Sequence, residues 1–191
     1  GGAIYGDDLL VIEGSIFKNN DGGYRGGAIY FDNGGLVTNS TFYHNESYNY
    51  GGALYADLNT TIVNNIFDGN DSEVYGSSQD HIYGVSSSYY DSQYNLFYAP
   101  STAPSGATYT VLSDPMFSDT VSMSLQNISP AIDAGDITML DSDKTQIDLG
   151  AVYFHQNADA IIITDHSWLS IFTTDSIDLS IKITTDIGNY I

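Results

Sequence analysis

Three aspartates recur at one position of a sequence repeat and could bind a metal ion together. Asp7, Asp32 and Asp57 each follow a Gly-Gly-Ala-Ile/Leu-Tyr motif by two residues. Ca²⁺ takes six to eight oxygen ligands and tolerates loose geometry, so an ion between neighbouring carboxylates would relieve their repulsion. Alternatively, each aspartate hydrogen-bonds its own turn and water screens its charge. The residues thus leave two hypotheses open: no cofactor, or Ca²⁺ at this column. A second acidic column has the same two interpretations; it contains Asp21, Glu46 and Asp71.

Aromatic residues form two further columns that could contact sugar rings. The first contains Tyr5, Tyr30, Tyr55 and Tyr83. The second precedes the glycine pair and contains Arg25, Tyr50 and Tyr75. Successive side chains of a strand point to opposite faces, so an inward Ile4 predicts an outward Tyr5. An exposed stack would offer a platform for sugars, with Arg25 over Tyr50, whereas a half-buried stack would be a packing ladder.

Other chemistry has weaker support. Asp141-Ser142-Asp143 followed by Asp148 is similar to the acidic pattern of a Ca²⁺-binding loop. It lacks the glycine and the glutamate of an EF-hand loop, so we expect a turn. The histidines show no paired ligand spacing, and no Gly-x-Ser-x-Gly motif occurs. A glycosidase needs two carboxylates, for which Asp32 and Asp57 are candidates, but any stacked pair would qualify. Regular columns argue against a specialised catalytic site, so we assign no catalytic residue.

The elements that position these residues follow from the repeat itself. Gly-Gly-Ala-Ile-Tyr at 1–5 returns at 26–30 and, with Leu for Ile, at 51–55, a period of 25 residues. Phe17, Phe42 and Phe67 form one column and Asn20, Asn45 and Asn70 another. The apolar runs are short, β-rich and bounded by turn residues, and the period is too short for a propeller blade. The sequence therefore predicts an all-β fold, a β-solenoid with about 25 residues per coil and about six coils.

Composition excludes several classes of function. Four Lys and Arg against 24 Asp and Glu give a formal net charge of −20. Such a surface repels phosphate backbones and anionic lipids, so we expect neither a nucleic-acid partner nor membrane insertion. The absence of cysteine excludes disulfides and a thiol nucleophile.

The repeats also resemble a known family. Gly-Gly-Ala-Ile/Leu paired with Phe-x-x-Asn, over residues 1–75, is similar to the repeats of chlamydial polymorphic outer membrane proteins and of many secreted parallel β-helix proteins. The fourth repeat departs from the pattern at 76–83. A second resemblance, at 114–154, is to the closing coils of secreted bacterial β-helix proteins. The resemblance implies that the solenoid is a right-handed parallel β-helix of the pectate-lyase-like class. It also implies an extracellular or cell-surface, bacterial-type location and an adhesin or autotransporter passenger.

We therefore expect two regions with different roles. Residues 1–154 form the C-terminal coils of a β-helix, and 155–191 begin a second, β-sandwich-like domain or β extension that is truncated. The function expected is adhesion, glycan contact or structural support, without catalysis in this fragment. Its partners would be a polysaccharide or cell-surface glycan and other domains of a longer chain. The alternative is a carbohydrate-active enzyme, a polysaccharide lyase or glycoside hydrolase of the parallel β-helix class.

Overall fold

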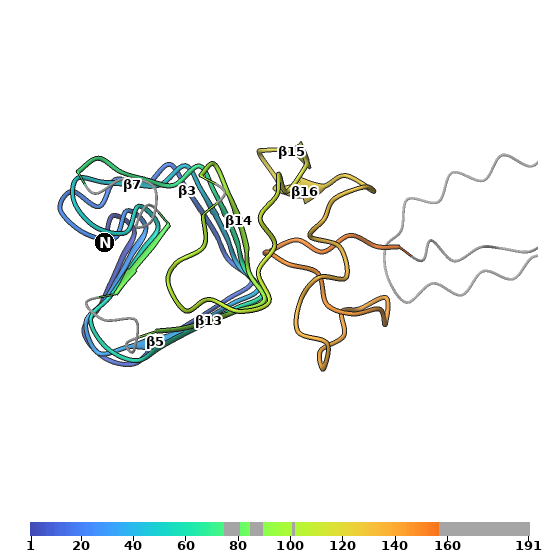
Figure 1. Cartoon of the computed structure of the whole chain (residues 1–191), viewed down its shortest axis with the longest axis horizontal. Coiled ribbons are helices and arrows are strands. Elements are labelled where there is room, and N and C mark those ends of the chain that lie inside the picture. The colour runs from blue at the N-terminus through green and yellow to red at the C-terminus, as the bar shows by residue number, and fades with distance from the viewer. Residues whose placement is uncertain (75–80, 85–89, 101, 157–191) are drawn as a thin grey trace, which may run out of the picture. The chain divides into compact units, whose positions relative to one another are not determined.

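Short parallel strands stacked in register form a β-solenoid, as the repeat predicted. The computed structural model describes residues 1–74, 81–84, 90–100 and 102–156, and no helix occurs among them. Strands of successive coils lie over one another in Figure 1. Three four-stranded parallel sheets and a smaller sheet make up the coil.

Each sheet collects one strand from every coil. Sheet A contains β1 (Ile4–Gly6), β4 (Ile29–Phe31), β8 (Leu54–Ala56) and β12 (Ile82–Gly84). Sheet B contains β2 (Leu10–Glu13), β5 (Gly35–Thr38), β9 (Thr60–Val63) and β13 (Tyr90–Gln93). Sheet C contains β3 (Ile16–Lys18), β6 (Thr41–Tyr43), β10 (Ile66–Asp68) and β14 (Leu96–Tyr98). Sheet D contains β7 (Glu46–Ser47) and β11 (Asp71–Ser72).

The register confirms the period read from the sequence. Ile4 pairs with Ile29, and Ile29 pairs with Leu54, so equivalent residues of the repeat lie side by side. The fourth coil is longer, because Tyr90 lies opposite Thr60. The right-handed sense of the coil stays a prediction, based on the strong preference of parallel crossover connections.

Stacked phenylalanines form the centre of the core. Phe17, Phe42, Phe67 and Phe97 have ring centroids 5.0, 4.9 and 5.2 Å apart and nearly parallel planes. Aliphatic columns from sheets A and B complete this core. Because each coil adds one layer to the same columns, burial is continuous along the solenoid axis.

Two polar ladders run beside this core. In the predicted one, Asn20 Nδ2 donates to Asn45 Oδ1 and Asn45 Nδ2 donates to Asn70 Oδ1, both at 2.8 Å. The second ladder was not predicted, because its residue type changes from coil to coil. It contains Ser15, Ser40, Asn65 and Asn95. Both ladders satisfy backbone N–H groups at corners, where strand pairing is interrupted.

Left-handed backbone conformations turn the chain at the corners. Gly26 and Gly51, before sheet A, have φ of +61° and +64°. A Cβ atom there would lie 2.2 Å from Ile29 O and 2.0 Å from Leu54 O. Glycine is therefore required at this corner for both conformation and space.

The end of the coil departs from the sequence prediction. Val111 still bridges to Leu96, but the chain then leaves the coil, so the solenoid has about three turns and the expected six coils are wrong. Ala103 packs against the core and Tyr90 Oη donates to Ser105 O, so this segment covers the end of the coil.

Residues 115–154 pack on the outer face of sheet C and add no closing coils. A hairpin of β15 (Phe117–Asp119) and β16 (Ser124–Leu125) begins this segment. Leu125, Ala131 and Leu149 bury the outward side chains of Ile66 and Leu96. This segment packs on sheet C because the outer face of the sheet carries an apolar column, and covering that column removes apolar surface from water.

The described residues belong to one compact unit, Gly1–Ala158, and the second unit, Asp159–Ile191, lies outside them. The predicted β domain at 155–191 therefore falls almost wholly outside the described residues and stays a prediction. Within the described part of the chain, no helix is long and apolar enough to cross a membrane.

Candidate binding surface on sheet A

The tyrosine column lies on the outer face of sheet A. Tyr5, Tyr30, Tyr55 and Tyr83 occupy the central position of β1, β4, β8 and β12 and pair in register. Their neighbours Ile29, Leu54 and Ile82 are buried in the core. Strand alternation thus places the phenols on the face opposite the core.

The column packs upon itself and is not a flat platform. Tyr5 and Tyr30 have ring centroids 5.1 Å apart at 64°, and Tyr30 and Tyr55 are 4.9 Å apart at 76°. Such edge-to-face pairs are favourable contacts between rings. Tyr5 is 55% exposed, whereas Tyr55 is only 1% exposed. The packing interpretation therefore describes the middle of the column, and ring faces are open at its edge.

The second column covers Tyr55. Arg25 and Tyr50 form a parallel bridge next to sheet A. The Arg25 guanidinium carbon lies 4.7 Å from the Tyr55 ring centroid and 5.8 Å from that of Tyr50. The rings of Tyr50 and Tyr83 lie 4.4 Å apart and are tilted by 30° to each other. The predicted contact between Arg25 and Tyr50 is present, and Tyr55 is the closer ring; Tyr75 lies outside the described residues.

Carboxylates anchor the phenol hydroxyls. Tyr5 Oη donates to Asp32 Oδ2 at 3.2 Å, and Tyr30 Oη donates to Asp57 Oδ2 at 2.5 Å. Burial, with the Asp57 carboxylate next in size, raises the pKa of Tyr30 to about 12, and the same causes raise the pKa of Tyr55. The phenols therefore stay neutral at physiological pH and act as hydrogen-bond donors.

The calcium hypothesis gains no support from side-chain grouping. Among the described residues, no three His, Cys, Asp or Glu side chains are placed to hold a metal ion. Asp32 and Asp57 each accept a tyrosine hydrogen bond, and Asp7 is exposed. A Ca²⁺ ion at Asp7, Asp32 and Asp57 stays a prediction.

Two exposed tyrosines extend this surface and were missed in the sequence. Tyr24 and Tyr48, 58% and 56% exposed, lie on neighbouring coils with ring centroids 6.5 Å apart. Val74, also exposed, follows on the next coil. We call Tyr24, Tyr48 and Val74 the corner ledge. Tyr24 and Val74 share one phase of the repeat but differ in residue type, and Tyr48 lies one residue out of that phase, so column analysis overlooks them. The one available signal was the local clustering of tyrosine near Arg25.

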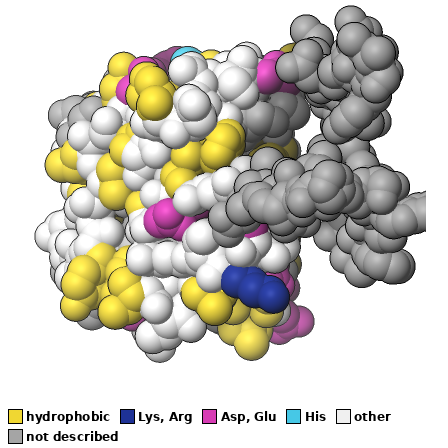
Figure 2. Space-filling model, turned by 90° about the vertical axis from the view of Figure 1, so that its right-hand side faces the viewer, with side chains coloured by type: hydrophobic (Ala, Val, Ile, Leu, Met, Phe, Trp, Pro, Cys, Tyr) yellow, Lys and Arg dark blue, Asp and Glu magenta, His cyan; other side chains and the backbone are white. Residues whose placement is uncertain are grey.

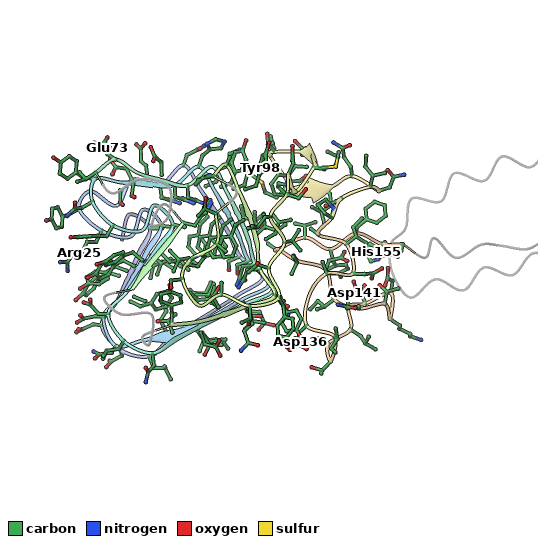
Figure 3. All side chains as sticks on the ribbon, viewed as in Figure 1. Arg25, Glu73, Tyr98, Asp136, Asp141 and His155 are labelled. Carbon is green, nitrogen blue, oxygen red and sulfur yellow. The ribbon has the colours of Figure 1, made fainter. Side chains whose placement is uncertain are left out.

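The corner ledge and the acidic C-terminal loop lie on different sides of the protein. Figure 3 shows Arg25 and Glu73 at one edge of the coil and Asp141 and His155 beyond the opposite edge. On the side that carries residues 115–154, hydrophobic side chains are scattered among uncharged ones (Figure 2). Exposed apolar residues of this segment include Ile128 and Tyr153, and the Tyr153 ring lies 5.0 Å from that of His155.

The acidic loop at 141–148 is a hydrogen-bonded turn. Buried Asp148 accepts bonds from the backbone N–H groups of Asp133 and Phe154. Asp143 accepts from Thr145 and Gln156. Desolvation, and then the Asp143 carboxylate, raise the pKa of Asp141 to about 6. These bonds fit the turn expected from the sequence.

Two buried ionisable groups have strongly shifted pKa values. Desolvation, reinforced by Asp114, raises the pKa of Asp68 to about 6 on the outer face of sheet C. Burial lowers the pKa of His81 to about 4. His81 Nε2 lies 2.8 Å from Pro100 O and Nδ1 lies 3.3 Å from Asn70 Nδ2, so neutral His81 donates to the first and accepts from the second. In both groups, burial in the packed protein is the main cause of the pKa shift.

Comparison with known proteins identifies no relative. No protein-family profile, no curated protein and no solved structure matches this chain. The parallel β-solenoid therefore stands on the structure itself, and the similarity of the repeats to chlamydial proteins stays a hypothesis.

Proposed function

We propose that this chain is part of an extracellular or cell-surface β-solenoid that contacts glycans and is not catalytic. The observation that carries the proposal is the aromatic array on the outer face of sheet A and its corner. Exposed aromatic surface beyond scattered single residues is characteristic of interaction sites. Tyrosine combines a large apolar ring with a hydroxyl at low conformational cost, which suits recognition surfaces.

The rigidity of the array supports a binding role. Each of two exposed rings packs against a half-buried one: Tyr5 against Tyr30, and Tyr24 against Tyr50. Arg25 lies against Tyr24, Tyr50 and Tyr55, which further restricts the corner. A preformed surface loses little conformational entropy when a ligand binds. The extracellular setting is supported by the resemblance of the repeats to those of chlamydial polymorphic outer membrane proteins.

The experiment is a glycan array followed by affinity measurements with two matched variants. Tyr24→Ala/Tyr48→Ala removes the aromatic part of the corner ledge without touching the buried rings. Tyr109→Ala/Tyr153→Ala removes two exposed tyrosines elsewhere and is the control. The proposal expects the first variant alone to lose binding. Equal loss in both variants, or no binding to any glycan, would refute it.

A second candidate is a carbohydrate-active enzyme, favoured by one observation on sheet C. Asp68 is 8% exposed, has a raised pKa and interacts electrostatically with Asp114. Two neighbouring carboxyl groups, one of which has a raised pKa, are the arrangement of a glycosidase acid and its partner. Release of reducing ends from a polysaccharide panel, abolished in Asp68→Asn, would establish this activity. Absence of release would leave the binding role.

A further inference from the structure

We propose that the surface formed by sheet A and the corner ledge selects neutral polysaccharides and rejects polyuronates. This inference rests on the proposed function and adds the chemical class of the ligand. It follows from the charges that surround the aromatic rings, from the way Arg25 is used, and from the hydrogen-bonding groups left open.

Carboxylates border the array on both sides. Asp7, Asp32 and Asp57 follow the strands of sheet A at one end. At the other end, sheet D presents a column of exposed acidic side chains that pair in register: Asp21, Glu46 and Asp71. Exposed Glu73 comes next in the chain. Carboxylates spaced by one strand separation create a negative electrostatic potential, which repels an anionic polymer as it approaches.

Arg25 does not offset this potential. Its guanidinium carbon lies over the rings of Tyr24, Tyr50 and Tyr55. Burial acts to lower its pKa, but Tyr55, then Tyr30 and last Asp57 outweigh this and raise it. The Nε atom of Arg25 is buried among these groups. The cation thus packs against the aromatic cluster, and these ring contacts compete with pairing to a uronate carboxylate.

The groups that remain suit an uncharged sugar. The exposed faces of Tyr5, Tyr24 and Tyr48 offer apolar contact to the C–H faces of pyranose rings. The half-exposed carboxylates of Asp32 and Asp57 accept hydrogen bonds, and sugar hydroxyls donate them. Charge-assisted bonds of this kind are stronger than neutral ones, so the same carboxylates that repel a polyuronate can bind a neutral chain.

Successive contacts along the solenoid favour a polymer over a single sugar. Exposed Tyr5 and half-buried Tyr30 lie on adjacent coils with ring centroids 5.1 Å apart, close to the size of one pyranose unit. The ledge rings of Tyr24 and Tyr48 repeat in the same direction on adjacent coils. A linear neutral chain lying along the axis would meet several contacts at once, which raises its apparent affinity.

The test measures binding of the whole chain to a neutral and an acidic polysaccharide. Suitable probes are a soluble glucomannan and polygalacturonate, each at low and high NaCl, with EGTA present to remove Ca²⁺. We expect the glucomannan to bind with little salt dependence and polygalacturonate not to bind at low salt. Tyr24→Ala/Tyr48→Ala should weaken glucomannan binding by at least about tenfold, whereas Tyr109→Ala/Tyr153→Ala should not.

The outcomes separate the two proposals. Binding of polygalacturonate alone, or equal binding of both polymers, would overturn the neutral-ligand inference and leave glycan contact as the function. Binding of neither polymer, with none on a glycan array, would overturn both. Glucomannan binding that survives Tyr24→Ala/Tyr48→Ala would overturn the location of the site.

Discussion

Asn45 is the residue whose loss should reveal how the coils are joined. Its side chain is fully buried and makes hydrogen bonds to both neighbouring coils. Oδ1 accepts from Asn20 N at 3.0 Å and Asn20 Nδ2 at 2.8 Å. Nδ2 donates to Asn70 Oδ1 at 2.8 Å and to Phe17 O at 3.0 Å. Asn45→Ala removes all four bonds, of which those to Asn70 and Phe17 are fully buried.

The expected loss is a large share of the stability. Each buried hydrogen bond contributes about 1 kcal/mol net, and an unsatisfied buried partner costs more, so Asn45→Ala should reduce the free energy of unfolding by about 4 kcal/mol. Domains have about 5–15 kcal/mol in total. With a urea m-value of about 2 kcal/mol/M, the midpoint should fall by about 2 M.

The matched control lies at the end of the same ladder. Asn20 is half-buried, and its side chain donates to Asn45 Oδ1. Asn20→Ala should therefore cost only about 1 kcal/mol and shift the midpoint by about 0.5 M. Far-UV circular dichroism in urea measures both. Equal midpoint shifts for the two variants would refute the argument that the buried ladder stabilises the coil stack.

Three further predictions concern stability. Burial lowers the pKa of His81 from an ordinary 6.5 to about 4, so the folded protein should be most stable with respect to this residue above pH 6.5, and its free energy of unfolding should fall by about 3 kcal/mol as the pH drops to about 4. A His81→Gln variant should lack this part of the pH dependence in urea titrations. An identical pH profile for the variant and the original chain would contradict the prediction. Gly51→Ala should lower the thermal midpoint far more than Gly14→Ala. Both glycines have a positive φ, +64° and +56°, but a Cβ atom at Gly51 would lie 2.0 Å from Leu54 O, whereas the space around Gly14 is open. Equal melting temperatures for the two variants would rule out the steric explanation. Asp32 already accepts a hydrogen bond from Tyr5, so we expect millimolar Ca²⁺ to leave the melting temperature unchanged. A rise in melting temperature with Ca²⁺ that is lost in Asp32→Asn would instead establish the calcium site.

The sequence alone determined the solenoid and its inner columns. A residue repeated every coil must stack on its own copies, so Phe17, Phe42 and Phe67 predicted the aromatic core, and Asn20 and Asn45 predicted a ladder. Strand alternation likewise predicted that Tyr30 lies outside the core. These inferences succeed because they depend on neighbours fixed by the period alone.

Tertiary structure decided what covers each outer face. Tyr5 and Tyr55 share a column, yet one is exposed and the other buried, because Arg25 packs over Tyr55 from an adjoining corner. Residues 114–154 resemble closing coils in the sequence, but Leu149 and its neighbours instead cover the outer side chain of Ile66. Such contacts join segments far apart in the chain and in different phases of the repeat, so local pattern carries no information about them; only the free energy of burying apolar surface in the assembled coil selects them.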